Sequence, residues 1–248
     1  MSSTLKSLHI SGKPVIFANV WDTISAKSIA PLDSCKALAT ASYAIAIANN
    51  TVDEKLTFEQ NINGIREVAT VAKEFNKPLT ADIQDGYGER LEEAFEALLD
   101  IGVSGCNLED YDNANRCMIP KDEAAERVRR AIAVAKRRSD PDFVINARCD
   151  TLVQGGELSE VIERGKAYLE AGATTVFVWG ASKRGVRTEE VKALVDAFEG
   201  RLSVKLDFDG LSVKELADIG VARVSVGPSM QMRMMKALAQ DAEALLKY

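Results

Sequence analysis

The chain has 248 residues, of which 46% are hydrophobic and 27% are charged, a composition typical of a globular domain that buries a sizeable core. Lys and Arg number 31 against 37 Asp and Glu, and the net charge of −6 argues against a nucleic-acid or anionic-membrane partner. The polar N-terminal segment lacks the apolar core of a secretory signal, and no apolar run is long enough to span a bilayer. We therefore expect a cytoplasmic protein.

Short apolar runs alternate with amphipathic patterns along the whole chain. Most of the apolar runs are continuous, as expected for parallel strands that are buried on both faces. The predicted strands cover residues 15–20, 37–42, 79–83, 105–109, 143–148, 175–179, 202–206 and 223–227. The predicted helices cover residues 23–30, 57–75, 90–100, 122–138, 158–171, 188–198, 212–218 and 230–246.

Eight strand–helix units in about 250 residues are typical of a (β/α)8 TIM barrel. No linker, low-complexity tract or change of composition divides the chain, so we predict a single TIM-barrel domain over residues 1–248. A doubly wound open sheet is the alternative, and it would need fewer parallel strands or an additional subdomain.

The ends of the predicted strands are polar, and barrel proteins bind their ligands at the carboxyl ends of the strands. The stretch ADIQDGYG, residues 81–88, follows the third strand and supplies oxygen ligands from Asp82 and Gln84. Such hard oxygen donors suit Mg²⁺, which takes one or two carboxylates and keeps several waters. Glu109 ends the fourth strand and can share the cation, and Arg148 on the fifth can pair with a substrate carboxylate. The pattern predicts a site for a small anionic acid whose enolate or oxyanion a metal stabilises.

The only histidine, His9, lies near the N-terminus. A histidine-rich metal site within one chain is therefore excluded, and a Ser-His-Asp triad is disfavoured.

Six motifs together resemble the isocitrate lyase and phosphoenolpyruvate mutase superfamily over nearly the whole length. They read NVWD at 19–22, TAS at 40–42, ADIQDGYG at 81–88, NLED at 107–110, INAR at 145–148 and GVARVS at 220–225. The resemblance implies a (β/α)8 barrel whose last helix is commonly swapped between subunits, and hence a homodimer or homotetramer. It also implies Mg²⁺ as the cofactor, or Mn²⁺ in its place.

The same resemblance implies roles for individual acidic and basic residues. Asp82 matches the metal-ligating aspartate, and Glu109 matches a further glutamate of the metal shell. Gln84 stands where the family usually has Asp or Glu, and Asp53 matches the acidic residue that precedes the third strand. Arg148 matches the arginine that faces the substrate carboxylate and is a candidate catalytic residue.

Substrate-binding residues are also implied. Ser42, Tyr43 and Ala44 fall where the family binds the 2-oxo-carboxylate end through hydroxyl and backbone N–H groups. The family usually has small residues near the last two positions, so Tyr43 can narrow the pocket or supply its own hydroxyl. Trp21 and Trp179 are expected to act as walls of the core or of the pocket.

The loop after the fourth strand bears on the reaction. Family lyases carry Lys-Lys/Arg-Cys-Gly-His there, with the Cys in proton transfer. Arg116 and Cys117 keep the lyase spacing, whereas Asn115, Met118 and Ile119 depart from the motif. Phosphonate-forming members carry Asp-Lys after the glutamate, which this chain lacks, so the loop favours lyase over mutase chemistry.

Three hypotheses follow. The first is a Mg²⁺-dependent lyase or decarboxylase that acts on a small 2-oxo or 2-hydroxy (di)carboxylic acid through a metal-stabilised enolate, with Cys117 or Tyr43 as proton donor. The second is phosphoenolpyruvate mutase or phosphonopyruvate hydrolase chemistry. The third is a non-catalytic 2-oxo-acid-binding protein, which the altered loop and Gln84 motivate.

Overall fold

The computed structural model describes residues 1–247, apart from the side chains of residues 182 and 183, and places eight parallel strands in one sheet, ordered β1-β10-β9-β8-β7-β4-β3-β2. A parallel backbone bridge between Val20 and Thr40 joins the two sides that would otherwise be open edges, so the sheet is a nearly closed barrel. This confirms the predicted TIM-barrel architecture. The barrel strands are β1 Val15–Phe17, β2 Leu38–Ala39, β3 Leu79–Asp82, β4 Gly105–Glu109, β7 Val144–Cys149, β8 Thr175–Val178, β9 Leu202–Lys205 and β10 Arg223–Ser225.

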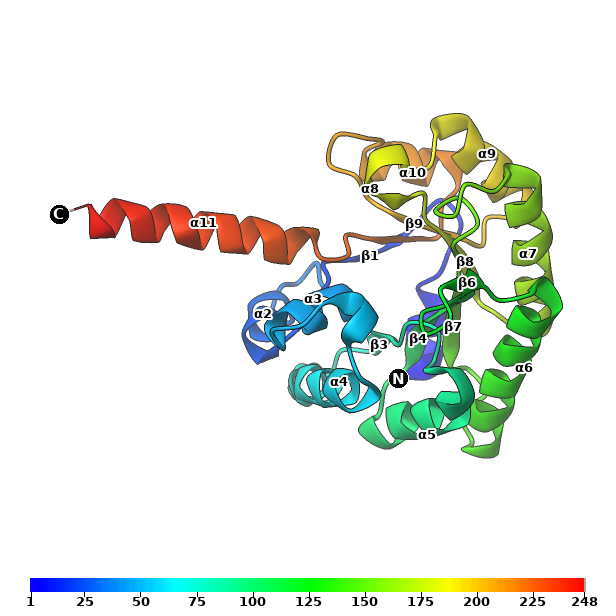
Figure 1. Ribbon diagram of the computed structural model, residues 1–248, viewed down its shortest axis with the longest axis horizontal. Coiled ribbons are helices and arrows are strands. Elements are labelled where there is room, and N and C mark those ends of the chain that lie inside the picture. Colours follow the sequence, from blue (N-terminus) through cyan, green and yellow to red (C-terminus); the bar gives the residue numbers. More distant parts are fainter. Residues whose placement is uncertain (248) are drawn as a thin grey trace.

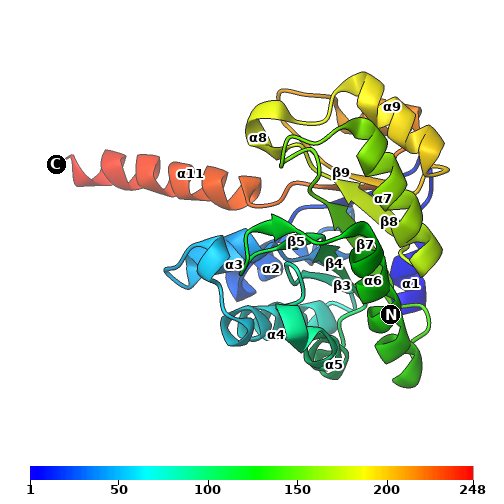
Figure 2. The same cartoon turned by 45° about the vertical axis from the view of Figure 1, so that its right-hand side comes forward.

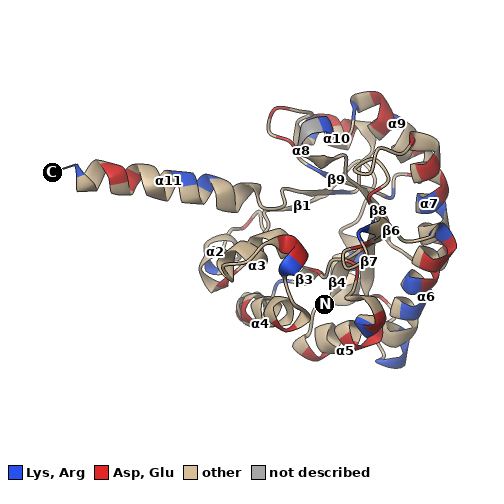
Figure 3. Ribbon diagram, in the orientation of Figure 1, with Lys and Arg blue, Asp and Glu red and all other residues tan. Residues whose placement is uncertain are grey.

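Helices surround the barrel on its outer side (Figures 1 and 2). They pack there because their apolar faces cover the outward-facing residues of the strands. The helices are α1 Ser2–Ser7, α2 Thr23–Ile29, α3 Ser42–Ala48, α4 Phe58–Glu74, α5 Leu91–Ile101, α6 Lys121–Arg137, α7 Leu158–Ala171, α8 Ala181–Arg184, α9 Thr188–Ala197, α10 Val213–Ile219 and α11 Ser229–Leu246, with short 3-10 turns η1 Asp53–Lys55 and η2 Gly88–Arg90. Charged residues of both signs lie along α5, α6, α7 and α9 (Figure 3).

The second predicted strand, residues 37–42, is longer than the strand in the structure. The apolar run at residues 37–48 divides into the two-residue strand β2 and the helix α3, which begins at Ser42. The segment SYAIAIA contains three alanines, the residue with the highest helix propensity, and a continuous apolar run alone does not distinguish a strand from a buried helix. The expected strand end at Ser42 is therefore a helix start.

A small hairpin after β4 was also not predicted. It consists of β5 Tyr111–Asp112 and β6 Cys117–Met118, which pair antiparallel. Its strands are too short to show a period in the sequence. The hairpin occupies the loop in which the lyase-type cysteine was expected.

The N-terminal end of the barrel is closed by α1. Leu5 is fully buried there against Val15, Phe17 and Val144, in a core cluster separate from the main one between strands and outer helices. This arrangement seals the end of the barrel opposite the carboxyl ends of the strands, where polar residues gather.

The last helix, α11, extends away from the barrel (Figures 1 and 2). Gln231 is its only buried residue among those described, whereas Met232, Met235 and Leu238 are exposed. No helix within residues 1–247 combines the length and the apolar character that a membrane crossing requires.

Candidate active site

A cavity of about 570 Å³ lies at the carboxyl ends of the strands. Each strand places its last inward-facing side chain there, since neighbouring parallel strands in register point the same way. The cavity is lined by Asn19, Ala41, Ser42, Tyr43, Asp53, Asp82, Asn107, Arg148, Phe177, Trp179, Lys205, Phe208, Ser225, Gly227, Pro228, Ser229, Met232 and Arg233.

Arg148 occupies the wall formed by β7. Its Nε and Nη2 donate to the two carboxylate oxygens of Asp150 at 2.7 and 2.9 Å, and its Nη1 donates to Glu109 at 2.5 Å. The guanidinium carbon lies 4.6 Å from the centre of the Trp179 ring. Burial alone would lower the pKa of Arg148, but Asp150 and Glu109 outweigh it and raise that pKa. The guanidinium is therefore permanently charged and fixed in direction at the edge of the cavity.

Asp150 is itself held from behind. Its backbone N–H donates to Asp110 at 2.8 Å, and the other oxygen of Asp110 accepts from the Tyr168 hydroxyl at 2.7 Å. Arg164 lies 3.5 Å from the same Asp110 oxygen. All of these groups are buried, where hydrogen bonds are strong and loss of a partner is costly. The orientation of Arg148 thus rests on a second layer of residues outside the cavity.

Asp82 and Asp53 bring two carboxylates to the β3 side of the cavity, one strand removed from β7. Asp82 ends β3, and one of its oxygens accepts from the backbone N–H of Ser42 at 3.1 Å and from its hydroxyl at 3.3 Å. Burial raises the pKa of Asp53 to about 6, and repulsion from Asp82 adds to the increase. The described part of the chain places neither carboxylate in an ion pair.

This pair fits a divalent cation. Among residues 1–247 no cluster of three or more His, Cys, Asp or Glu is arranged to hold a metal, but Mg²⁺ characteristically takes one or two carboxylates and keeps its remaining waters. Asp53 and Asp82 supply hard oxygen donors, and their mutual repulsion is relieved by a cation. The donor set suits Mg²⁺ better than zinc, which prefers Cys and His.

The other two predicted metal ligands lie behind this pair. Glu109 does not line the cavity, and its carboxylate is bonded to Arg148. Burial raises the pKa of Glu109 well above its usual range, although Arg148 opposes the change. The amide nitrogen of Gln84 donates to the backbone oxygen of Asp53 at 2.7 Å and to its carboxylate at 3.1 Å. Both side chains support groups that face the cavity.

The predicted substrate-binding residues divide into two groups. Ser42, Tyr43 and Trp179 line the cavity, whereas Trp21 and Ala44 belong to the hydrophobic core. The Ala44 backbone N–H donates to Ala41 within the first turn of α3, and the Ser42 N–H is already bonded to Asp82.

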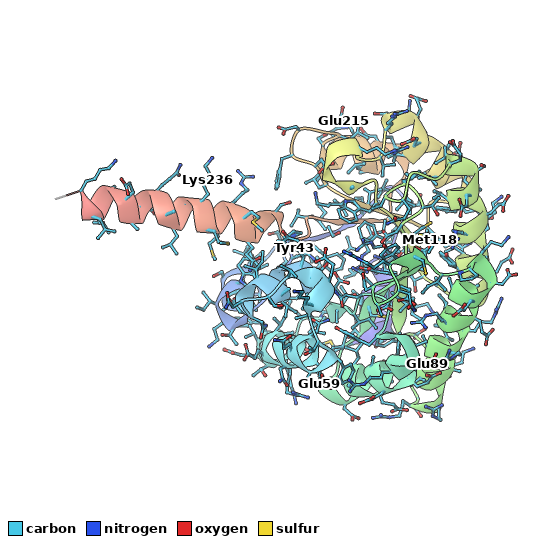
Figure 4. All side chains as sticks on the ribbon, viewed as in Figure 1. Tyr43, Glu59, Glu89, Met118, Glu215 and Lys236 are labelled. Atoms are coloured by element: carbon cyan, nitrogen blue, oxygen red, sulfur yellow. The ribbon has the colours of Figure 1, made fainter. Side chains whose placement is uncertain are left out.

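The predicted thiol lies outside the cavity. Cys117 is exposed on the β5–β6 hairpin and is not a lining residue. In Figure 4 the neighbouring Met118 lies on the α6–α7 side of the barrel, whereas Tyr43 lies on the α3 side, beside the start of α11. Of the two candidate proton donors, the structure brings Tyr43 to the cavity.

Several lining residues were not predicted from the sequence. Asn107 and Lys205 stand at strand ends, so their position was a usable signal. Phe208, Met232 and Arg233 come from the loop after β9 and from α11, and nothing in the local sequence marks them as site residues.

Comparison with known proteins identifies the family. Residues 5–246 match the family model described as phosphoenolpyruvate phosphomutase, and the chain belongs to this family, within the phosphoenolpyruvate mutase and isocitrate lyase superfamily. A Mycobacterium tuberculosis protein described as uncharacterized is 28% identical over 241 residues, covering 96% of this chain and 87% of its own. The 2-methylisocitrate lyase of Escherichia coli is 33% identical over 138 residues, covering 52% of this chain and 42% of its own.

Solved structures agree with the fold. A crystal structure from Burkholderia cenocepacia, whose phosphonomutase assignment is provisional, has a TM-score of 0.89 at 32% identity and covers 98% of this chain and 97% of its own. Oxaloacetate acetylhydrolase in complex with oxalate has a TM-score of 0.87 at 24% identity, covering 100% and 87% of the two chains. The superfamily comprises lyases, mutases and hydrolases that act on small carboxylic acids and generally use Mg²⁺.

Proposed function

We propose that the protein is a Mg²⁺-dependent carbon–carbon lyase acting on a small 2-oxo or 2-hydroxy carboxylic acid. The observation that carries the proposal is the presence, in one cavity, of a fixed guanidinium and of two carboxylates that form no ion pair within the described part of the chain. Arg148 supplies the guanidinium, and Asp53 and Asp82 supply the carboxylates. The carboxylate of a bound acid and the oxygen that becomes negative during the reaction both need positive charge nearby. Arg148 and the bound cation would provide it.

Asp82 and Asp53 would hold the cation, with Gln84 orienting Asp53 through its two hydrogen bonds. When bound there, Mg²⁺ supplies positive charge that stabilises oxygen anions of the substrate. Ser42 keeps Asp82 pointed at the cavity through its backbone and hydroxyl donors.

Arg148 would bind the substrate carboxylate through the N–H groups of Nη1 and Nη2 that Glu109 and Asp150 do not use, because each of these nitrogens carries two hydrogens. Phe177 and Trp179 line the cavity beside it and exclude water from the reacting atoms. In a 2-hydroxy acid, cleavage of the carbon–carbon bond would turn the hydroxyl carbon into a carbonyl, with the hydroxyl proton passing to water, and would leave the other fragment as an enolate that takes up a proton. The Tyr43 hydroxyl, on a side chain in the cavity that is 46% exposed, can deliver that proton and recover it from water.

The test is a mass-spectrometric screen of 2-oxo and 2-hydroxy mono- and dicarboxylic acids with the purified protein and Mg²⁺. We expect one acid to be cleaved, and chelation of the metal or the isosteric substitution Asp82→Asn to remove turnover. Asp122→Asn, at the start of α6 and away from the cavity, makes the same change of charge and should leave the rate unchanged. Equal turnover by Asp82→Asn and the unaltered chain would refute the proposed role of the metal.

Two results would replace the proposal. Formation or cleavage of a carbon–phosphorus bond, followed by ³¹P NMR, would assign phosphonate chemistry, which the description of the family model brings into consideration. Tight binding of oxalate by calorimetry without turnover of any acid in the screen would assign a non-catalytic binding protein.

A further inference from the structure

A layer of polar side chains crosses the inside of the barrel directly below the cavity. The neighbouring strands β4, β7 and β8 contribute Asn107, Asn146 and Thr175 in register, and β10 contributes Arg223 from another side of the barrel. Arg223 is the largest fully buried side chain described, with 1% of its surface exposed. Such a residue needs an explanation, because an arginine is rarely buried without a carboxylate partner.

Arg223 has no carboxylate within ion-pair distance among residues 1–247. Its guanidinium stacks over Phe17 at 4.6 Å, and its Nη1 lies 3.5 Å from His9 Nε2. Its Nη2 donates to Asn107 Oδ1 at 3.1 Å. Asn107 is the one member of this set of partners that also lines the cavity.

This contact fixes which way the Asn107 amide faces. A guanidinium has donors and no acceptor, so Arg223 can only meet the oxygen of the amide. Asn146 Nδ2 donates to the same oxygen at 2.8 Å, and the Thr175 hydroxyl donates to Asn146 Oδ1 at 2.7 Å. A hydroxyl can also accept, so the direction of Asn107 rests on Arg223: reversing the Asn107 amide would place its nitrogen against the guanidinium donor.

The Nδ2 group of Asn107 is consequently turned away from the polar layer. No group within residues 1–247 accepts a hydrogen bond from it, and it is not among the buried unpartnered atoms. The residue is half-buried and lines the cavity between Asp82 and Arg148 on the adjacent strands. An amide N–H₂ held in this way can donate a hydrogen bond to an anionic oxygen in the cavity.

We propose that Asn107 is a substrate-binding residue whose Nδ2 donates to an oxygen of the bound acid, and that Arg223 is the positioning residue that orients it. The inference rests on the proposed function, since it names a further contact in the same cavity. It also gives the buried cation a purpose: Arg223 holds the amide oxygen, and its charge lies beneath the place where the substrate carries negative charge.

The test substitutes Asn107→Asp and measures oxalate binding by calorimetry at constant, excess Mg²⁺. The substitution keeps the shape of the side chain and gives Arg223 a carboxylate, but it replaces the donor with an acceptor that repels the anion. We expect oxalate to bind at least tenfold more weakly, with an unfolding midpoint no lower than that of the unaltered chain. Mg²⁺ affinity, measured without oxalate, should not fall, because a carboxylate is added beside Asp82.

Asn63→Asp is the matched control. Asn63 is exposed on α4 and accepts a hydrogen bond from Arg66, so this change adds the same charge far from the cavity and should leave oxalate binding unchanged. Equal oxalate affinity in Asn107→Asp and the unaltered chain would overturn the inference alone. Failure of the unaltered chain to bind oxalate would overturn the proposed function, and the inference with it.

Two substitutions of Arg223, which does not itself line the cavity, test its positioning role. Arg223→Met removes the donor that fixes the Asn107 amide while keeping the length of the side chain, and Arg223→Lys retains a cationic donor. We expect Arg223→Met to weaken oxalate binding about threefold or more, and Arg223→Lys to restore most of that loss. A general packing defect would not be repaired by the smaller lysine head group. Unchanged affinity in Arg223→Met would show that Arg223 does not orient the amide.

Discussion

Replacing Arg148 by methionine removes the cation that two buried carboxylates share. The side chain of Arg148 is 15% exposed, and those of Glu109 and Asp150 are 5% and 4% exposed. Removing one member of a buried ion pair costs about 3–5 kcal/mol, since the remaining charge is left without a partner. For a chain of this size that corresponds to an unfolding midpoint lower by on the order of 10 °C.

The cost should depend on pH with a definite sign. Burial already raises the pKa of Glu109 against the opposing charge of Arg148, and without the arginine that pKa rises further. The folded variant then binds a proton more readily than the unfolded chain, so its stability is greatest in acid and is lost as pH rises. Thermal unfolding at about pH 5 and about pH 8 should therefore show a smaller deficit at the lower pH.

Two further variants serve as a rescue and a control for this experiment. Arg148→Met combined with Glu109→Gln should recover part of the lost stability, because the uncompensated charge is gone. Arg129→Met, which breaks an exposed pair with Glu126 on α6, should change stability by about 0.5 kcal/mol or less. If Arg148→Met lost the same stability at both pH values, or no more than Arg129→Met, the electrostatic account of this wall would be wrong.

Other consequences can be checked separately. Burial and the charge of Arg223 lower the pKa of His9 to about 3, so protonation of the unfolded chain should cost ~2 kcal/mol of stability by about pH 5; urea unfolding of His9→Gln across this range should lack that loss. Tyr43→Phe should lower turnover about 100-fold while Cys117→Ser leaves it within about twofold, and the reverse result would assign the proton transfer to the hairpin thiol. Light scattering should show a homodimer or homotetramer, as expected from the exposed apolar residues of α11 and from the helix exchange that the family resemblance implies. Leu238→Glu, at a position 66% exposed, should shift the oligomer toward the monomer.

The sequence was sufficient for the barrel and for the residues whose position follows from a strand end. Strand–helix alternation is a local property, and parallel strands carry their terminal side chains to one rim. Asp82 and Arg148 were therefore placed correctly at the cavity. The division of residues 37–48 into a strand and a helix depends on tertiary packing, and for that reason the secondary structure expected of Ser42 was wrong although the residue lines the cavity.

Contacts between segments that are distant in the chain could not be predicted from the sequence pattern. The partners of Arg223 are His9, Phe17 and Asn107, which a charged residue inside a short strand does not reveal. Trp21 was expected as a wall of the core or of the pocket, and the chain buries it in the core.

The charges around the cavity explain why the proposed Mg²⁺ and the neutral amide of Gln84 occur together in this chain. Glu109 and Asp150 are bonded to the guanidinium of Arg148, and Asp53 and Asp82 line the same cavity, so an anionic substrate that binds beside Arg148 also meets negative charge. On the proposed function, Mg²⁺ offsets two of these charges. A further acid at position 84, which the family resemblance leads one to expect, would add negative charge next to Asp53. Gln84 instead donates to that carboxylate, so the chain gives up some attraction for the metal and gains attraction for the acid that must bind beside it.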